Sequence, residues 1–335
     1  MATASGTVDT PRDRSLLEPS RGGRLPDRLL KWSLTILSIG VIVLIAYFFA
    51  RLIVESRPVF AETGFFGFIF DNAWVPSKNL YGALPLVVGT LITSAIALVI
   101  GVPIAVATAL FITELCPSRL RAPLSVLVEM LAAVPSVVYG LWGFFFLIPK
   151  LKPAEQWFSD TFGFLPFVGG TVSGPNYFIA GLILAIMILP IVSAISREVM
   201  STVPRENKEA ALALGATRWE MIRMTVIPYS RSGIVGGSML GLGRAIGETI
   251  AVTIVIGNAP VIGDTIFSQG YSLAAVIANE FGEAASDPVH RAALIAAGLV
   301  LFILTLFVNA VARALVVRAE RGQRAARKPA AGMAG

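Results

Sequence analysis

Charged residues are scarce in this chain of 335 residues, since only 14% are Asp, Glu, Lys or Arg. Soluble globular domains typically contain about 25% charged residues. Here 55% of the residues are hydrophobic and the mean hydropathy is +0.76. These values exclude a typical soluble domain and also a disordered chain, which has low hydrophobicity. The pI near 9.7 would suit a nucleic-acid partner, but the apolar content argues against one.

Cysteine and histidine are almost missing, which limits the chemistry open to this chain. The single cysteine, Cys116, and the single histidine, His290, exclude an internal disulfide framework and a Cys/His zinc cluster. A Ser-His-Asp triad is not credible with one histidine in a predicted loop. We interpret His290 as a loop residue at a helix start, and we expect no catalytic residue and no metal site.

A nucleotide-binding phosphate loop is missing as well. The Walker A motif requires Gly-Lys followed by Ser or Thr. The six lysines are followed instead by Trp32, Asn79, Leu151, Pro153, Glu209 and Pro329. We therefore expect this chain to bind no ATP and to carry no cofactor of its own.

Long apolar runs are what the sequence has in place of these features. A helix that crosses a bilayer needs roughly 20 mainly apolar residues. Six stretches meet this requirement, at residues 32–50, 79–113, 123–149, 176–196, 233–257 and 292–312. They predict an all-α integral membrane protein with six transmembrane helices in a lipid bilayer. Glu129, near the start of the third run, is interpreted as an interfacial charge.

The lysines and arginines predict the orientation. Most of the 27 fall in the N-terminal tail, in the turn at 114–122, in the segment at 197–232 and at the C-terminal end. The loops on the opposite side hold only five, which are Arg51, Arg57, Lys78, Lys150 and Lys152. Cytoplasmic loops carry the excess of positive charge, so both termini are predicted to be cytoplasmic.

The same pattern predicts the domain organisation. We expect flexible cytoplasmic tails at residues 1–28 and 319–335, which are rich in Ala, Gly, Arg and Pro. An N-terminal transmembrane helix is expected at 29–54 and a membrane core at 81–313. The first apolar run is longer than the core of a signal peptide and no A-x-A cleavage site comes after it, so it is predicted to be a retained helix.

Residues 203–228, here called the coupling segment, lie between the fourth and fifth runs and predict a helix–turn–helix. Pro204 suits the first turn of a helix, and Gly215 is a natural terminator because it tolerates the left-handed conformation. Thr217 and Glu220 form a capping box for a second helix, which Pro228 is expected to end. From these residues alone, an amphipathic linker lying on the membrane is an equally good interpretation.

The coupling segment resembles the signature loop of ABC importer permeases. The resemblance rests on Glu209-Ala210-Ala211, then Gly215 four residues on, and Pro228 at the end. The chain departs from the family pattern at Thr225 and Ile227, which keep the size class. The resemblance implies a type I ABC importer permease fold for residues 81–313. It also implies that Glu209, Ala210, Ala211 and Gly215 dock on a separate ATPase subunit, which binds ATP and Mg.

Two charged residues, Arg244 and Glu248, interrupt the fifth run about midway along its length. Ionisable residues within membrane spans are by default functional candidates, and a spacing of four places them on one face of a continuous helix. Arg provides forked contacts to an oxyanion, while a carboxylate can accept a hydrogen bond from an anion that keeps a proton. Phosphate at pH 7 does so and sulfate does not. A structural ion pair between the two residues is the alternative.

Glycines recur on the same run at intervals of four, as Gly233, Gly237 and Gly241 and again as Gly243 and Gly247. This spacing permits close contact between membrane helices, so helix packing is the predicted role. A pathway lined by small residues is the alternative.

Several longer strings are similar to the phosphate-import permeases of the PstC type. These are GLGRAIGETIAV at 241–252, SREVMSTVPRENKEAALALGATRWE at 196–220, VPSVVYGLWG at 134–143 and IANEFGEA at 277–284. The resemblance implies a subunit of an ATP-driven phosphate importer in the bacterial inner membrane, with Arg244 and Glu248 on the substrate path. It implies a second permease chain (PstA type), an ATPase dimer (PstB type) and an extracytoplasmic phosphate-binding protein (PstS type) as partners. An ABC permease for sulfate or molybdate, or a stand-alone ion-coupled transporter, are the alternatives.

Overall fold

The computed structural model describes residues 24–326, which are almost entirely helical. Of the tails predicted at 1–28 and 319–335, residues 1–23 and 327–335 lie outside the described residues, while residues 24–28 and 319–326 are helical. Contacts divide the chain into two compact units at the boundary between Arg51 and Leu52. Helix α1 (Arg24–Thr63) crosses that boundary and is longer than the expected 29–54. Its side chains from 27 to 48 are exposed and mainly apolar, which requires lipid or another chain to cover them.

The all-helical membrane class is confirmed by length and composition, but the count of spans differs from the expected six. Within residues 24–326, four helical stretches are long and apolar enough to cross a membrane, at 27–63, 84–115, 177–201 and 288–314. A fifth candidate is the pair 118–133 and 136–162, which is bent by 89°. The predicted run at 233–257 divides instead into α10 (Ile227–Gly247) and α11 (Ile250–Val255), and so does not form one continuous span.

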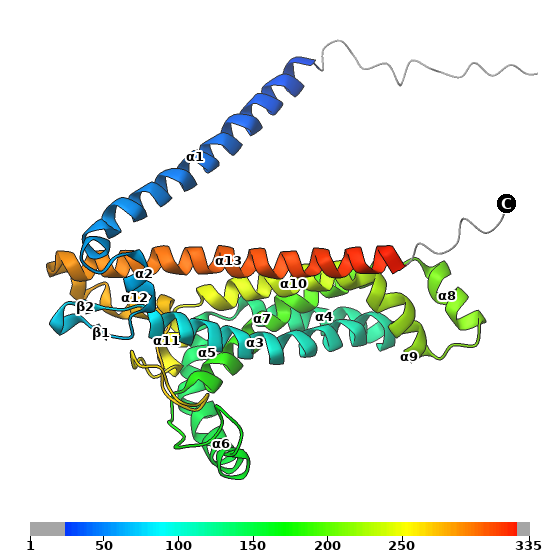
Figure 1. Cartoon of the computed structure of the whole chain (residues 1–335). Helices are drawn as coiled ribbons and strands as arrows, with labels where there is room; N and C mark the ends of the chain where they lie inside the picture. Colours follow the sequence, from blue (N-terminus) through cyan, green and yellow to red (C-terminus); the bar gives the residue numbers. More distant parts are fainter. Residues whose placement is uncertain (1–23, 327–335) are drawn as a thin grey trace, which may run out of the picture. The chain divides into compact units, whose positions relative to one another are not determined.

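The centre of the second unit is built on α3 (Leu84–Leu110), α7 (Tyr177–Ser201) and α10, which lie side by side (Figure 1). Small residues allow the close approach: a Cβ added at Gly181 would lie 2.5 Å from Ile96 Cγ2, and one at Gly101 would lie 3.0 Å from the carbonyl oxygen of Ala185. Burying these apolar faces against one another stabilises the bundle mainly through van der Waals packing, because lipid is as apolar as the side chains.

The two ends of this bundle differ in character (Figure 1). One end carries the coupling segment, with α8 (Arg205–Ala213) and α9 (Arg218–Met221). The other end carries the hairpin of β1 (Trp74–Val75) and β2 (Leu80–Tyr81) together with α2 and α12. The remaining elements are α2 (Phe65–Phe70), η2 (Pro76–Lys78), η3 (Phe111–Leu115), α4 (Ser118–Ala133), α5 (Ser136–Trp142), η4 (Gly143–Leu147), α6 (Ile148–Phe162), η5 (Ile222–Val226), α12 (Leu273–Glu280), η6 (Glu283–Ser286) and α13 (Pro288–Ala326).

His290 lies near a helix start, as expected, but it belongs to the first turn of α13 and not to a loop, and its side chain is buried. Its Nε2 is 2.9 Å from Glu280 Oε2, and the same oxygen accepts a hydrogen bond from Trp74 Nε1 at 3.0 Å. The imidazole also stacks on Tyr81, with ring centroids 5.7 Å apart. These contacts connect the β1–β2 hairpin, α12 and α13 at the end of the bundle opposite α8.

Candidate functional site

The coupling segment has the predicted helix–turn–helix form. Helix α8 ends at Ala213, and Gly215 adopts a φ of 86°, where a side chain would be strained. The capping box is present in full: Glu220 N donates to Thr217 Oγ1 at 3.3 Å, and Thr217 N donates to Glu220 Oε2 at 2.8 Å. These local contacts fix where the second helix begins.

Pro228 does not end the second helix, contrary to the prediction. Helix α9 continues through η5 into α10, where Pro228 occupies the first turn. Proline has no backbone N–H to donate, and Pro228 closely follows the π-helical turn η5, where the regular α-helical hydrogen-bond pattern is already interrupted. The coupling segment is therefore joined to α10 without a flexible break.

Helix α8 stands out from the bundle with none of its residues buried. Glu209 and Ala210 are exposed and Ala211 is partly exposed. Leu214, just after the helix, is 90% exposed and Trp219 is 64% exposed. Exposed apolar side chains beside charged ones are typical of a surface that another protein covers.

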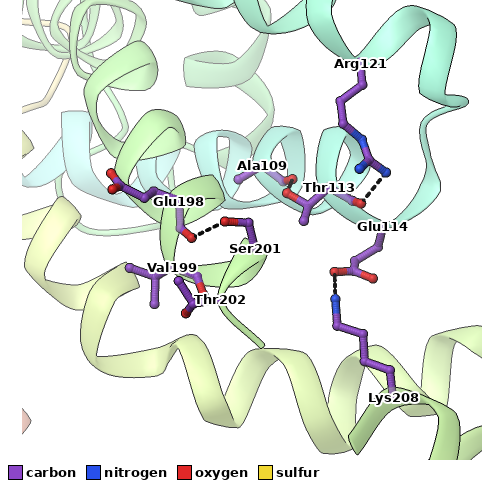
Figure 2. Close-up of polar contacts among 9 residues, drawn as sticks. All are labelled: Ala109, Thr113, Glu114, Arg121, Glu198, Val199, Ser201, Thr202 and Lys208. Carbon is purple, nitrogen blue, oxygen red and sulfur yellow. Dashed lines mark hydrogen bonds and ion pairs between the residues drawn. The ribbon is translucent and has the colours of Figure 1, made fainter. Parts of the chain in front are cut away.

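One ion pair connects α8 to the membrane bundle (Figure 2). Lys208 Nζ lies 2.6 Å from Glu114 Oε1, and the two side chains are only 20% and 8% exposed. Glu114 belongs to η3, which extends α3. Arg121 on α4 donates through Nη2 to the carbonyl oxygen of Thr113 in η3 at 2.8 Å. These contacts connect α8 to η3, and η3 to α4.

Arg244 and Glu248 do not share a helical face, which corrects the expectation from their spacing. Arg244 is exposed in the last turn of α10, whereas Glu248 comes after the helix in an extended conformation with ψ 125°. No ion pair joins these two side chains in the described part of the chain. Glu248 Oε1 instead accepts a hydrogen bond from Ala251 N at 3.4 Å, at the start of α11. The charge of Arg244 therefore remains available to another group.

A second helix break, which the sequence patterns did not predict, comes directly before a helix that packs on α11. Helices α4 and α5 are separated by Val134 and Pro135. Past the break, a Cβ added at Gly140 would lie 2.8 Å from Ile254 Cδ1 of α11. Pro135 was the available signal, since the residue before a proline avoids the helical conformation. Non-helical backbone at membrane depth is tolerated only in a protein interior or beside water, so both breaks require one of these two environments.

The glycines of α10 fall into two groups. A Cβ added at Gly233 would lie 2.3 Å from Val199 Cγ2, one at Gly237 would lie 3.1 Å from Ile195 Cβ, and one at Gly241 would lie 2.8 Å from Val192 Cγ2. These three lie against α7. For Gly243 and Gly247, an added Cβ meets nothing within 4 Å among the described residues. The expected close contact is therefore absent at these two, because their side of the helix faces open space.

Gly233→Ala is expected to destabilise the protein, because the new methyl group must displace Val199. Overpacking of this kind costs about 1–3 kcal/mol. The matched control is Gly236→Ala on the same helix, where a Cβ meets nothing within 4 Å and the gain in helix propensity is about 1 kcal/mol. Thermal unfolding of the two purified variants in detergent measures the difference. Equal midpoints would contradict a packing role for Gly233.

Glu155 on α6 is a buried carboxyl group that the sequence did not reveal, and it lies beyond the apolar run at 123–149. Glu155 is only 4% exposed, and its Oε1 has no hydrogen-bond partner among the described residues. Oε2 accepts a hydrogen bond from Asn176 Nδ2 at 3.1 Å, and Asn176 Oδ1 in turn caps α7 by accepting from Ile179 N at 2.8 Å. Burial raises the pKa of Glu155 to about 7, against the smaller opposing effect of the Asn176 hydrogen bond.

Stability is expected to fall as pH rises through 7 because of Glu155. The folded protein holds this proton more tightly than the unfolded chain, whose pKa is near 4.5, so the stabilisation is complete below pH 4.5 and is lost above 7. From pH 5.5 to 8 the expected loss is about 2 kcal/mol. Glu155→Gln removes this loss, while Asp160→Asn, an exposed carboxylate on the same helix, retains it. Unchanged pH dependence of the unfolding midpoint in Glu155→Gln would refute the assignment.

Among residues 24–326, no three His, Cys, Asp or Glu side chains come together in a group that could hold a metal.

Known proteins resemble this chain over most of its length. A profile described as "binding-protein-dependent transport system inner membrane component" matches residues 101–321. The phosphate transport system permease protein PstC of Pasteurella multocida (strain Pm70) is 45% identical over 289 residues, covering 85% of this chain and 89% of the relative. PstC of Haemophilus influenzae is 40% identical over 300 residues, covering 88% and 94%.

The fold has a counterpart among solved structures. A chain from the crystal structure of a bacterial ABC transporter involved in the import of the acidic polysaccharide alginate aligns with a TM-score of 0.54. The alignment covers 86% of this chain and 97% of that one, at 17% identity, and this identity supports the fold alone. Because the profile covers most of the chain and the relatives cover nearly all of it, the chain belongs to the binding-protein-dependent transport system inner membrane components, and among them to the PstC-type phosphate permeases.

Proposed function

We propose that this chain is the membrane permease subunit of an ATP-driven importer of inorganic phosphate in a bacterial inner membrane. The observation that carries the proposal is its 40–45% identity, over nearly its whole length, to phosphate transport system permeases. The exposed helix α8, joined to the bundle through Lys208 and Glu114, supports a chain that receives force from a partner.

Six crossings with both termini in the cytoplasm form part of this proposal. In this proposal α10 and α11 together form one further crossing, which is interrupted at Glu248 and Thr249. Discontinuous membrane helices of this kind occur at transport sites. The excess of Lys and Arg in the segment at 197–232 and at the chain ends supports the orientation.

The partners proposed are a second permease chain (PstA type), two ATPase subunits (PstB type) and an extracytoplasmic phosphate-binding protein (PstS type). The ATPase subunits would bind ATP and Mg and would contact the surface of α8 around Glu209. Helix α4 has no buried residue, which leaves an apolar surface for the second permease. In this arrangement the chain performs no catalysis, and ATP is hydrolysed by the complex as a whole.

The proposed mechanism is alternating access. Closure of the ATPase subunits displaces α8, and the Lys208–Glu114 pair and the continuous helix from α9 into α10 transmit this displacement. The helix breaks at 134–135 and 248–249 allow the halves of each interrupted helix to reorient. Arg244 contacts the phosphate oxygens through its planar fork, and Glu248 accepts the hydrogen bond of the proton that phosphate retains.

The test is ATPase activity of the complete complex reconstituted in liposomes with its binding protein. Phosphate is expected to stimulate hydrolysis and to accumulate inside, while sulfate does neither. Stimulation by sulfate or molybdate instead would identify a permease for another oxyanion. Phosphate uptake that continues without ATP and depends on an ion gradient would identify a stand-alone secondary transporter and refute the proposal.

A further inference from the structure

A cavity of about 440 Å³ lies at the end of the bundle that carries α8. It is open to the surface and lined by η3, α4 and α7, and neither Arg244 nor Glu248 lines it. Its polar lining includes Thr113, Arg121, Ser125, Glu129, Arg197 and Glu198. Figure 2 shows Thr113, Arg121 and Glu198 on the helices that carry them. The cavity therefore brings together two guanidinium groups and two carboxylates, one of each from α4 and one of each from α7.

Arg197 has a buried donor that nothing in the described chain satisfies. Its Nη2 lies 2.5 Å from Glu129 Oε1, which links α7 to α4. Its Nη1 is buried and has no hydrogen-bond partner. Buried donors without a partner are rare in native proteins and call for an explanation such as a missing ligand. A structural ion pair alone accounts for Nη2 and leaves Nη1 unexplained.

Arg121 also lines the cavity, from α4. Its Nη2 donates to the carbonyl oxygen of Thr113 at 2.8 Å, and its own carbonyl oxygen accepts from Ser125 Oγ at 2.7 Å. One guanidinium nitrogen is used in this way, so the other N–H groups can reach a ligand. Forked donors of this kind match the oxygens of a phosphate group.

The charges of the four ionisable residues cancel, which restricts the ligand. A fully deprotonated anion would be attracted by Arg121 and Arg197 but repelled by Glu129 and Glu198. An anion that keeps a proton can accept from the arginines and donate to a carboxylate. The carboxylate of Glu198 makes no hydrogen bond or ion pair within the described residues, so it is available as that acceptor. The proposed substrate path likewise provides one arginine, Arg244, and one glutamate, Glu248.

We propose that this cavity is a second oxyanion site, separate from Arg244, which binds a protonated phosphate group between Arg121 and Arg197. The inference rests on the proposed phosphate transport and adds a phosphate-binding site near the α8 end of the transport path. The phosphate group would come either from free phosphate in transit or from the headgroup of an anionic lipid. Both offer the same oxygens to the arginines, and only the experiment separates them.

The test measures equilibrium binding of radiolabelled orthophosphate to the nucleotide-free transporter complex, freed of its binding protein, in nanodiscs of phosphatidylcholine. Arg197→Gln and Arg121→Gln are each expected to weaken binding about tenfold or more, because each removes charge-assisted hydrogen bonds. Arg119→Gln is the matched control: it removes one positive charge from the same helix, and Arg119 does not line the cavity. It is expected to bind as the wild type does. Sulfate should compete poorly.

The outcomes are distinct. Binding that survives in Arg244→Gln and is lost in Arg197→Gln supports the second site. Binding lost only in Arg244→Gln, or absent in the wild type, overturns it, as does equal weakening by Arg119→Gln. Labelled phosphatidylglycerol that co-purifies with the wild type but not with Arg197→Gln, without orthophosphate binding, assigns the site to a lipid headgroup. Normal ATP-driven phosphate uptake alongside any overturning result leaves the proposed function intact, whereas a complex that imports only sulfate refutes that function itself.

Discussion

Glu209→Arg is expected to abolish association with the ATPase subunits and to reduce phosphate uptake by a factor of about 100. Glu209 lies on α8, where no residue is buried within this chain, so the substitution changes the surface and leaves the core intact. Charge reversal at the centre of a docking surface leaves an unpaired charge in the interface, and this is among the most damaging single changes an interface undergoes. Co-purification of the ATPase with the tagged permease measures the effect.

Asn207→Arg is the matched control for this prediction. Residues two positions apart lie about 200° apart around a helix, so Asn207 faces away from Glu209 on the same exposed helix. The added arginine at that position should leave both association and uptake close to the wild type. Intact ATPase association in Glu209→Arg would show that the EAA motif of this chain does not dock as proposed.

Arg244→Gln is expected to reduce phosphate uptake by a factor of about 100 while the complex still assembles, because a planar fork of charge-assisted donors is lost from the path. Arg244 makes no ion pair among the described residues, so its removal leaves none of their charges uncompensated. Arg244→Lys keeps the charge but not the fork and should retain an intermediate rate. Uptake of labelled phosphate into proteoliposomes at fixed ATP measures all three forms.

Arg231→Gln serves as the control for Arg244, since it removes one arginine from the same helix, near the coupling segment. Glu248→Gln addresses the carboxylate separately. It should lower phosphate uptake, because the glutamine amide lacks the acceptor strength of the carboxylate toward a protonated anion. Wild-type uptake in Glu248→Gln would leave only the capping contact to Ala251 as the role of this residue.

The local structure of the coupling segment was readable from its residues. Gly215, Thr217 and Glu220 act within a few residues of one another, and the predicted turn and capping box are both present. The prediction for Pro228 was wrong because a proline can either end a helix or be accommodated in a helix that continues, here just after the π-helical turn η5. The packing of the next residues decides between the two, and here α10 packs on α7 through glycines at 233, 237 and 241.

The helix breaks and the polar contacts of the candidate sites needed the fold. Arg197 contacts Glu129 across 68 residues of sequence, and Lys208 contacts Glu114 across 94. Trp74 reaches Glu280 across 206 residues. No local pattern encodes such pairs, because the sequence around each residue is equally typical of an unpaired surface charge or an interfacial aromatic residue. Glu155 was missed for the same reason, since its burial depends on how α6 packs.

By itself the sequence determined the membrane class, the apolar helices, the coupling segment and the family, because apolar run length, capping residues and motif spacing are local properties of the chain. The tertiary structure decided that Arg244 and Glu248 lie on either side of a helix end, that two interrupted helices meet, and which carboxylates are buried. These outcomes depend on packing between distant segments, where the gain from close contact outweighs the preference of a single helix to continue.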